Sequence, residues 1–223
     1  MRRRYSWDEL IPIDETRASA EYLVNTWYLI SKASPDKYAF KHHEPKLTEL
    51  LAYNLNMLKA DSGLTGFWIT EDNVPYIDEH GQVRRTRNDI KYLSNISTLG
   101  IELTFEFKKL KHTSSALCTY RGKDGMRRFV QGNYAKKQPF AAMVAIILDD
   151  PKTISQALYK SLSIPAIRSD LCMVHDGDGN YIRRPANVLR SIAEFDTEHR
   201  RPADKAPVNG TTTIAHILIR CPM

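Results

Sequence analysis

Two residues of opposite charge stand two positions apart in a segment with the composition of a β-strand. Residues 101–110 read Ile-Glu-Leu-Thr-Phe-Glu-Phe-Lys-Lys-Leu. Successive side chains of a strand point to opposite faces, so Glu106 and Lys108 share one face while Phe105 and Phe107 share the other. A carboxylate and an amine are therefore expected side by side on a rigid element.

A second carboxylate, Asp89, precedes Glu106 by enough residues for one strand, a hairpin and a returning strand. The two acids can thus meet on neighbouring strands. Mg²⁺ prefers oxygen ligands and is usually held by one or two carboxylates, with water and substrate phosphate in the remaining positions. Lys108 beside them would orient or deprotonate an attacking water, or offset negative charge on the phosphate.

A third acid comes from a helix expected between Glu44 and about Lys59, with Pro45 in its first turn. The apolar stripe of this helix consists of Leu47, Leu50, Leu51, Leu55 and Leu58. Glu44 falls at the edge of that stripe and so faces the body of the protein. It is a candidate to complete the site or to anchor a second metal.

Other elements follow from the periodicity of apolar residues. A helix is expected from about Glu15 to Ser31. Three closely spaced segments of strand character, 66–70, 83–93 and 101–110, predict an antiparallel meander. Later patterns predict a basic helix at 125–136, a strand buried on both faces at 140–148, a helix at 153–162, a hairpin at 171–182 and a strand at 214–220.

This order of elements, with an acid on the second strand and Glu-x-Lys on the third, resembles the PD-(D/E)xK, restriction-endonuclease-like nuclease superfamily. The matching residues are Asn88-Asp89 and Glu106-Phe107-Lys108, with Glu44 where the superfamily often has a helical acid. The resemblance covers roughly residues 40–148. Asn88 stands where the superfamily's name specifies Pro, at a position that varies widely among its members.

The resemblance implies an α/β fold of the α+β kind with a mixed sheet. Its core of helix, three-stranded meander, helix and strand would occupy residues 41–150. Residues 1–40 would form an N-terminal helical extension, and residues 151–223 a C-terminal extension packed on the same domain.

The function that the resemblance implies is that of a Mg²⁺-dependent endonuclease, with Mn²⁺ as a substitute, which hydrolyses phosphodiester bonds by metal-activated water. Asp89, Glu106, Lys108 and Glu44 would be catalytic, and the three acids would be the metal ligands. DNA is expected as the substrate rather than RNA, because members of the superfamily commonly act on DNA. Its members serve in restriction, phage defence, recombination and repair. An effector of antiviral (phage) defence or restriction is expected, as a homodimer or as one subunit of such a system.

The charge balance suits such a partner. The net charge of +6 and the pI of about 9.2 favour a polyanion, because each neutralised phosphate releases counterions. A positive rim beside the acids is expected from Arg84, Arg85, Arg87, Arg127 and Arg128. For the last two, a solvated basic helix face is an equally good interpretation. His112, which follows the Glu-x-Lys strand, could also face phosphate.

Two rival functions remain open. The first is a nuclease-like fold with inert carboxylates, whose basic surface binds nucleic acid or a partner protein. The second is a hydrolase of nucleotides, which would share the metal but has no need for so many basic residues outside the site.

The remaining polar features favour structural roles. Three widely spaced cysteines without a secretory leader or long apolar run predict a soluble cytoplasmic protein with no membrane segment and no zinc finger. Asp176-Gly-Asp-Gly179 lacks the twelfth-position acid of a calcium loop and predicts a hairpin turn. Asp149-Asp150 is interpreted as a strand end before Pro151. His199 and His216 receive no functional role.

Overall fold

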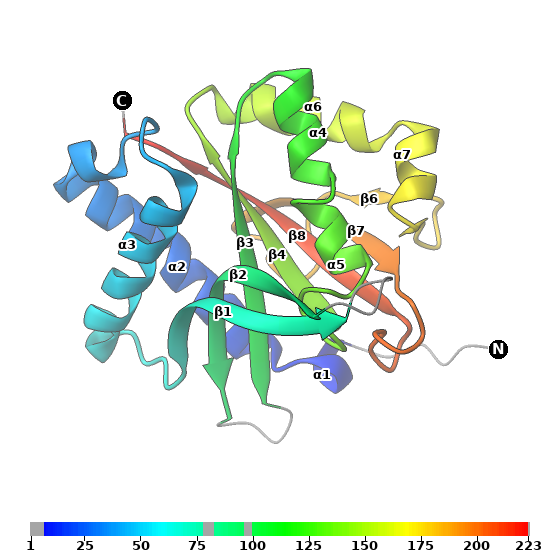
Figure 1. Ribbon diagram of the computed structural model, residues 1–223, viewed down its shortest axis with the longest axis horizontal. Helices are drawn as coiled ribbons and strands as arrows, with labels where there is room; N and C mark the ends of the chain where they lie inside the picture. Colours follow the sequence, from blue (N-terminus) through cyan, green and yellow to red (C-terminus); the bar gives the residue numbers. More distant parts are fainter. Residues whose placement is uncertain (1–6, 78–82, 96–99, 223) are drawn as a thin grey trace.

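The computed structural model describes residues 7–77, 83–95 and 100–222, with backbone alone for residues 8, 71–77 and 83–88. Its centre is a mixed eight-stranded sheet flanked by helices, which confirms the predicted mixed α/β class (Figure 1). The strand order is β1-β2-β3-β4-β8-β7-β5, and β6 also pairs with β7.

The first half of the chain supplies a helical layer and the expected meander. Its helical segments are α1 (Trp7–Leu10), α2 (Ile13–Ala33), η1 (Pro35–Tyr38), α3 (Glu44–Met57) and η2 (Lys59–Asp61). Its strands are β1 (Phe67–Ile77), β2 (Val83–Ser94) and β3 (Ile101–Leu110). β1 pairs with β2 and β2 with β3, both antiparallel, as predicted.

The second half completes the sheet. Its helices are α4 (Ser114–Arg121), α5 (Met126–Val130), α6 (Pro151–Leu162) and α7 (Pro165–Asp170). Its strands are β4 (Phe140–Ile147), β5 (Met173–Val174), β6 (Ile182–Arg183), β7 (Ala193–Arg200) and β8 (Thr211–Arg220). β4 runs parallel to both β3 and β8, so three parallel strands occupy the middle of the sheet.

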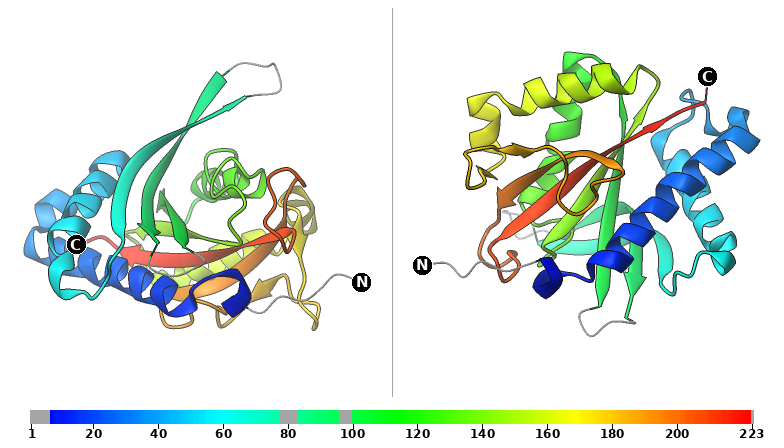
Figure 2. Two further views of the ribbon diagram at one scale, coloured as in Figure 1. Left: turned by 90° about the horizontal axis from the view of Figure 1, so that it is seen from below. Right: turned by 180° about the vertical axis from the view of Figure 1, so that it is seen from behind.

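The alternation of side chains along β4 separates two hydrophobic cores. Phe140, Ala142, Val144 and Ile146 belong to the core beneath α2 and α3. The residues between them belong to the core beneath α4, α5 and α6. All eight residues of the strand are buried, as its unbroken apolar sequence predicts for a central strand covered on both faces. Figure 2 shows the helices on the two sides of the sheet.

Residues from all three predicted ranges, 1–40, 41–150 and 151–223, contribute to the hydrophobic core beneath α2 and α3. Ala20 of α2, Leu47 of α3 and Ile217 of β8 are fully buried in it. The boundaries at residues 40 and 150 stay a prediction. In the part of the chain that is described, none of the helices has the length and apolar character needed to cross a membrane.

Two predicted elements are wrong in detail. The basic helix expected at 125–136 is limited to α5, because Gly132 adopts a positive φ of 66° and Ala135 one of 48°, which end regular helix. The hairpin expected at 171–182 does not form as such. Its arms β5 and β6 each pair with β7 instead of with one another, although Asp176 does organise the turn between them through bonds from the backbone of Asp178 and Asn180.

Candidate active site

The candidate site lies where β2 and β3 separate. Described pairing between these strands covers Ile90–Ser94, whereas β2 remains paired with β1 as far as Val83. Asp89 is the next residue of β2 after the last pair, Ile90 with Phe105. The edge of β3 beyond Phe105 therefore has outward backbone N–H groups that β2 no longer satisfies.

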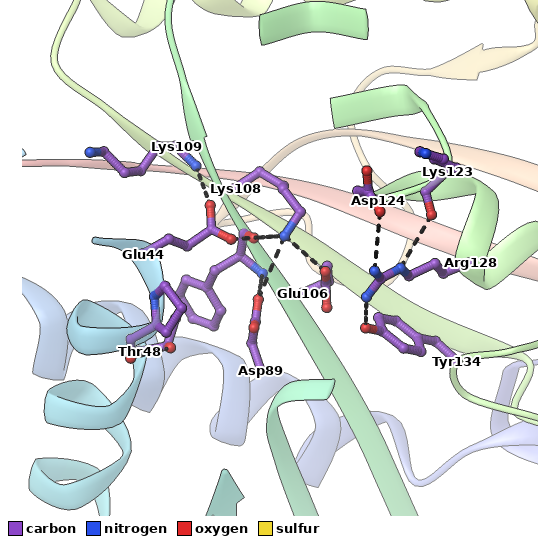
Figure 3. Close-up of polar contacts among 12 residues, drawn as sticks. Glu44, Thr48, Asp89, Glu106, Lys108, Lys109, Lys123, Asp124, Arg128 and Tyr134 are labelled. Atoms are coloured by element: carbon purple, nitrogen blue, oxygen red, sulfur yellow. Dashed lines mark hydrogen bonds and ion pairs between the residues drawn. The ribbon is translucent and has the colours of Figure 1, made fainter. Parts of the chain in front are cut away.

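Two carboxylates take the place of the missing strand. The backbone N–H of Phe107 donates to Asp89 Oδ2 at 2.7 Å, and that of Lys109 donates to Glu44 Oε2 at 2.8 Å. Glu44 lies in the first turn of α3. Leu47, Leu51 and neighbouring apolar residues anchor that helix in the core. Backbone geometry thus fixes both acids against the same strand (Figure 3).

Lys108 connects the three predicted acids. Its Nζ lies 2.8 Å from Glu44 Oε1, 2.9 Å from Glu106 Oε1 and 4.0 Å from Asp89 Oδ2. Burial disfavours its charged form, but the carboxylates of Glu106, Asp89 and Glu44 outweigh burial and raise the pKa of Lys108. We call Glu44, Asp89, Glu106 and Lys108 the carboxylate–lysine cluster.

Glu106 is the most deeply buried acid of the cluster, with 1% of its side chain exposed. Burial, and next the charge of Asp89, raise the pKa of Glu106 to about 8, although Lys108 opposes the shift. Burial likewise raises the pKa of Asp89 to about 6. Glu106 Oε2 has no hydrogen-bond partner among the described atoms. A buried acceptor in that state is costly, so the cluster is short of positive charge or donors.

Arg128 and Tyr134 face the cluster from α5 and the loop after it (Figure 3). Arg128 donates to the hydroxyl of Tyr134, to Lys123 O at 3.2 Å and to Asp124 at 3.2 Å. Its charge acts against the raised pKa values of Asp89 and Glu106. Burial, followed by the charge of Glu106, raises the pKa of Tyr134. Tyr134 was absent from the predicted site, because a lone tyrosine in a turn gives no spacing signal.

The structure describes the side chains of Arg127 and Arg128 from the predicted positive rim. Arg128 faces the acids, but Arg127 forms an ion pair with Asp170 of α7 instead. The side chains of Arg84, Arg85 and Arg87 lie outside the described residues. His112 is exposed, and its backbone N–H donates to Asp149.

The donor chemistry of the cluster suits a hard divalent cation. Its carboxylates offer oxygen ligands, and the unpartnered Glu106 Oε2 supplies an unused one. However, among the side chains that the structure describes, no three of His, Cys, Asp or Glu are grouped as they would be around a metal. In this arrangement the ammonium of Lys108 is the cation between the acids.

A second buried polar group has a different character. Tyr120, His216, Thr197 and His199 are fully buried and form a hydrogen-bonded chain that ends at the carbonyl of Leu171. Burial lowers the pKa of His199 to about 4 and that of His216 to about 3, so both imidazoles are neutral. We call this group the histidine chain.

The Leu171 carbonyl at the end of the histidine chain determines which atom donates in each of its hydrogen bonds. The Leu171 carbonyl can only accept, so His199 Nδ1–H donates to it and His199 Nε2 accepts from the hydroxyl of Thr197. The Thr197 oxygen then accepts from His216 Nε2–H, and His216 Nδ1 accepts from the Tyr120 hydroxyl. All ring nitrogens of both buried histidines thus have partners within the protein.

Structural roles also account for the other polar features. Asp150 caps α6 by accepting from Thr153 N at 2.9 Å, which agrees with its interpretation as a strand-ending residue.

No protein-family model, no curated protein and no solved structure matches the chain. The functional interpretation therefore depends on the geometry of the site.

Proposed function

We propose that the protein is a metal-dependent endonuclease of the PD-(D/E)xK kind that hydrolyses phosphodiester bonds in DNA. The observation that carries this proposal is the carboxylate–lysine cluster itself. Three acids share one ammonium, and the deepest of them retains an unpartnered oxygen. Buried charge of this kind costs stability, and perturbed ionisable groups concentrate at functional sites.

Asp89 and Glu106 would hold Mg²⁺ or Mn²⁺, with Glu44 as a further ligand or as the residue that positions Lys108. Once bound, the metal would act as a Lewis acid on the phosphate and on water. The raised pKa of Lys108 keeps it an ammonium, which favours charge stabilisation over deprotonation of water as its role. Arg128 would add a second positive charge on the opposite side of Glu106.

The choice of DNA over RNA and a role in antiviral defence rest on the resemblance to the superfamily. The positive net charge is compatible with either nucleic acid. Assembly as a homodimer or with a partner subunit is part of the same proposal.

A cleavage assay tests the function. Purified protein is incubated with plasmid, linear duplex, single-stranded DNA and RNA, each with Mg²⁺, Mn²⁺ or EDTA. Glu106→Gln should lower the rate by a factor of about a hundred or more, as expected for losing an essential charged group. Glu102→Gln is the matched control, because Glu102 lies on the same strand in an ion pair with Lys91 at 2.9 Å.

Lys108→Ala and Asp89→Ala should both lose cleavage activity, for different reasons. Without Asp89 the cation should bind more weakly, and higher Mg²⁺ should recover part of the rate. Without Lys108 the cation and DNA should still bind while turnover falls by about a hundredfold. Wild-type cleavage by Lys108→Ala, with contaminating nuclease excluded, would sink the mechanism.

The alternative function is a nuclease-like module that binds nucleic acid or protein without cutting. It is favoured by the bonds that Asp89 and Glu44 already accept from the backbone of β3 and by the ammonium of Lys108 between the acids. DNA binding by the wild-type protein, with no cleavage of any substrate in Mg²⁺ or Mn²⁺, would favour this alternative.

A further inference from the structure

A shallow pocket of about 540 Å³ adjoins the carboxylate–lysine cluster at the end of β3. It lies between the loop before α3 and the start of α4. The polar side chains that line it are Lys41, Lys109, Lys111, Thr113, Ser115 and Thr119. The lining contains three potential ammonium groups and three hydroxyls but no carboxylate, which is the composition of an anion site.

Phe40 holds two of these amines in the pocket. Lys109 Nζ lies 4.4 Å from the centre of the Phe40 ring and Lys111 Nζ lies 5.5 Å from it. Lys109 Nζ also donates to His42 O at 3.1 Å. None of the pocket lysines forms an ion pair with a residue that the structure describes. Cations gathered around one ring repel one another, so an anion between them would be stabilised.

The pocket also receives the first turn of α4. Thr113 caps this helix by accepting from Ala116 N, and its hydroxyl lies 3.3 Å from that of Ser115. The free N–H groups and the positive end of the helix dipole favour an anion at this position. The helix end therefore adds to the charge of the lysines.

The strand β3 contributes residues both to the pocket and to the candidate site. Lys109 donates its backbone N–H to Glu44 and extends its amine away from Lys108 towards the pocket (Figure 3). Lys111 is three residues beyond Lys108, so their Cα atoms are at most roughly 11 Å apart. A ligand that reaches both places needs two anionic groups separated by a distance of this order.

We infer that this pocket binds a phosphate of the nucleic-acid strand whose neighbouring phosphodiester lies at the carboxylate–lysine cluster. The inference rests on the proposed function. It adds a positioning contact on one side of the reacting bond, separate from the acids. A polymer fits better than a free anion, because the pocket is shallow and a single phosphate would be held largely by exposed side chains. Lys41 and Lys111 are both exposed.

The test compares two double variants in the full-length protein. Lys41→Ala with Lys111→Ala removes two pocket amines and leaves Lys109 in place. Lys152→Ala with Lys160→Ala removes two exposed amines from α6 and serves as the charge-matched control. Binding of a fluorescent duplex and of a single strand of the same sequence is measured against salt concentration in EDTA, which prevents metal-dependent cleavage. Inorganic phosphate is titrated separately as a competitor.

The pocket variant should lower the slope of log affinity against log salt by roughly 0.7 to 0.9, the contribution of one phosphate contact. The control should keep the wild-type slope. Equal slopes for both variants, or no binding of nucleic acid by the wild type, would overturn the inference. Inorganic phosphate that displaces nucleic acid at concentrations near those of the oligonucleotide would also overturn it, because the pocket would then be a free-anion site. Pocket-dependent binding without cleavage in Mg²⁺ would support the pocket and contradict the proposed nuclease.

Discussion

The carboxylate–lysine cluster and the histidine chain are both buried, polar and supported by the same sheet, but their balance of charge differs. In the histidine chain every donor meets an acceptor, and both imidazoles are neutral. In the carboxylate–lysine cluster three acids surround one ammonium, and Glu106 Oε2 has no described partner.

This difference in charge balance distinguishes two roles of buried polar side chains. A satisfied neutral network contributes to a unique packing and needs nothing from outside the protein. A cluster with excess acid is stabilised by any cation that reaches it, so its stability is coupled to a ligand. Burial of a polar residue alone would not have distinguished the two regions. The following predictions test this contrast through the stability of the fold.

The largest effect is expected for Lys108→Ala, measured by urea denaturation in EDTA. Removing the ammonium leaves three acids together, and loss of one partner from a buried ion pair costs about 3 kcal/mol or more. Added Mg²⁺ should recover a substantial part of this loss, because the cation binds the folded state. Cation binding of this kind would be visible as a rising denaturation midpoint.

Lys91→Ala is the control for that experiment. Lys91 is a buried lysine, with 7% of its side chain exposed, and pairs with Glu102, which is 36% exposed and can regain water. Its variant should be destabilised without a response to Mg²⁺. The contrast between the two regions fails if Lys108→Ala is equally insensitive to Mg²⁺.

A smaller effect is expected in the histidine chain for Thr197→Val. Valine has nearly the shape of threonine but leaves His216 Nε2–H without its acceptor and His199 Nε2 without its donor. The expected cost is about 2 kcal/mol, the scale for buried groups left unpaired. Cleavage by the folded variant and its response to Mg²⁺ should be those of the wild type.

Thr212→Val is the matched control. Thr212 is also fully buried, but its hydroxyl has no partner in the described part of the chain. The same substitution there should be neutral or slightly stabilising, because it removes an unsatisfied group. Equal losses at positions 197 and 212 would mean that the hydrogen bonds of the histidine chain contribute little.

A further effect is a pH dependence of stability that is specific to Glu106. The folded protein keeps the proton of Glu106 up to a pKa of about 8, whereas the unfolded chain releases it near the ordinary glutamate pKa of 4.5. Between these values the folded state binds more protons, so this residue makes stability fall as pH rises, by at most about 1.4 kcal/mol per pH unit. Glutamine does not titrate. In EDTA, Glu106→Gln should therefore gain stability relative to wild type from pH 5 to pH 8, and parallel profiles would contradict the assignment.

Sequence periodicity predicts an element and the direction of its side chains where one face carries residues of a single kind. The alternation in β3 predicted that Glu106 and Lys108 oppose Phe105 and Phe107, and the two phenylalanines do lie in the core on the other face. The unbroken apolar run predicted β4 within one residue of its end. The apolar stripe of α3 likewise predicted the direction of Glu44, because leucines at helical spacing fix its rotation.

Long-range pairing and local backbone geometry were beyond this kind of pattern. β7 was missed because its buried positions include Asp196, Thr197 and His199, whose partners come from distant segments. For the same reason the sequence pattern assigns β5 and β6 to each other, whereas both pair with β7. Tyr134 approaches the acids through a turn that no residue spacing encodes.

The position of β8 in the sheet has a consequence for the protein during its synthesis. β8 is made after the other described strands, yet it lies between β4 and β7, and Trp27 of α2 donates to the carbonyl of Arg220 at its end. While the ribosome adds the intervening residues, at roughly 5–20 per second, the apolar β4 has an unpaired edge for several seconds. Such an edge can pair with another nascent chain. Slower translation between β4 and β8 should therefore lower the yield of folded protein, and a chaperone that shields β4 should restore it.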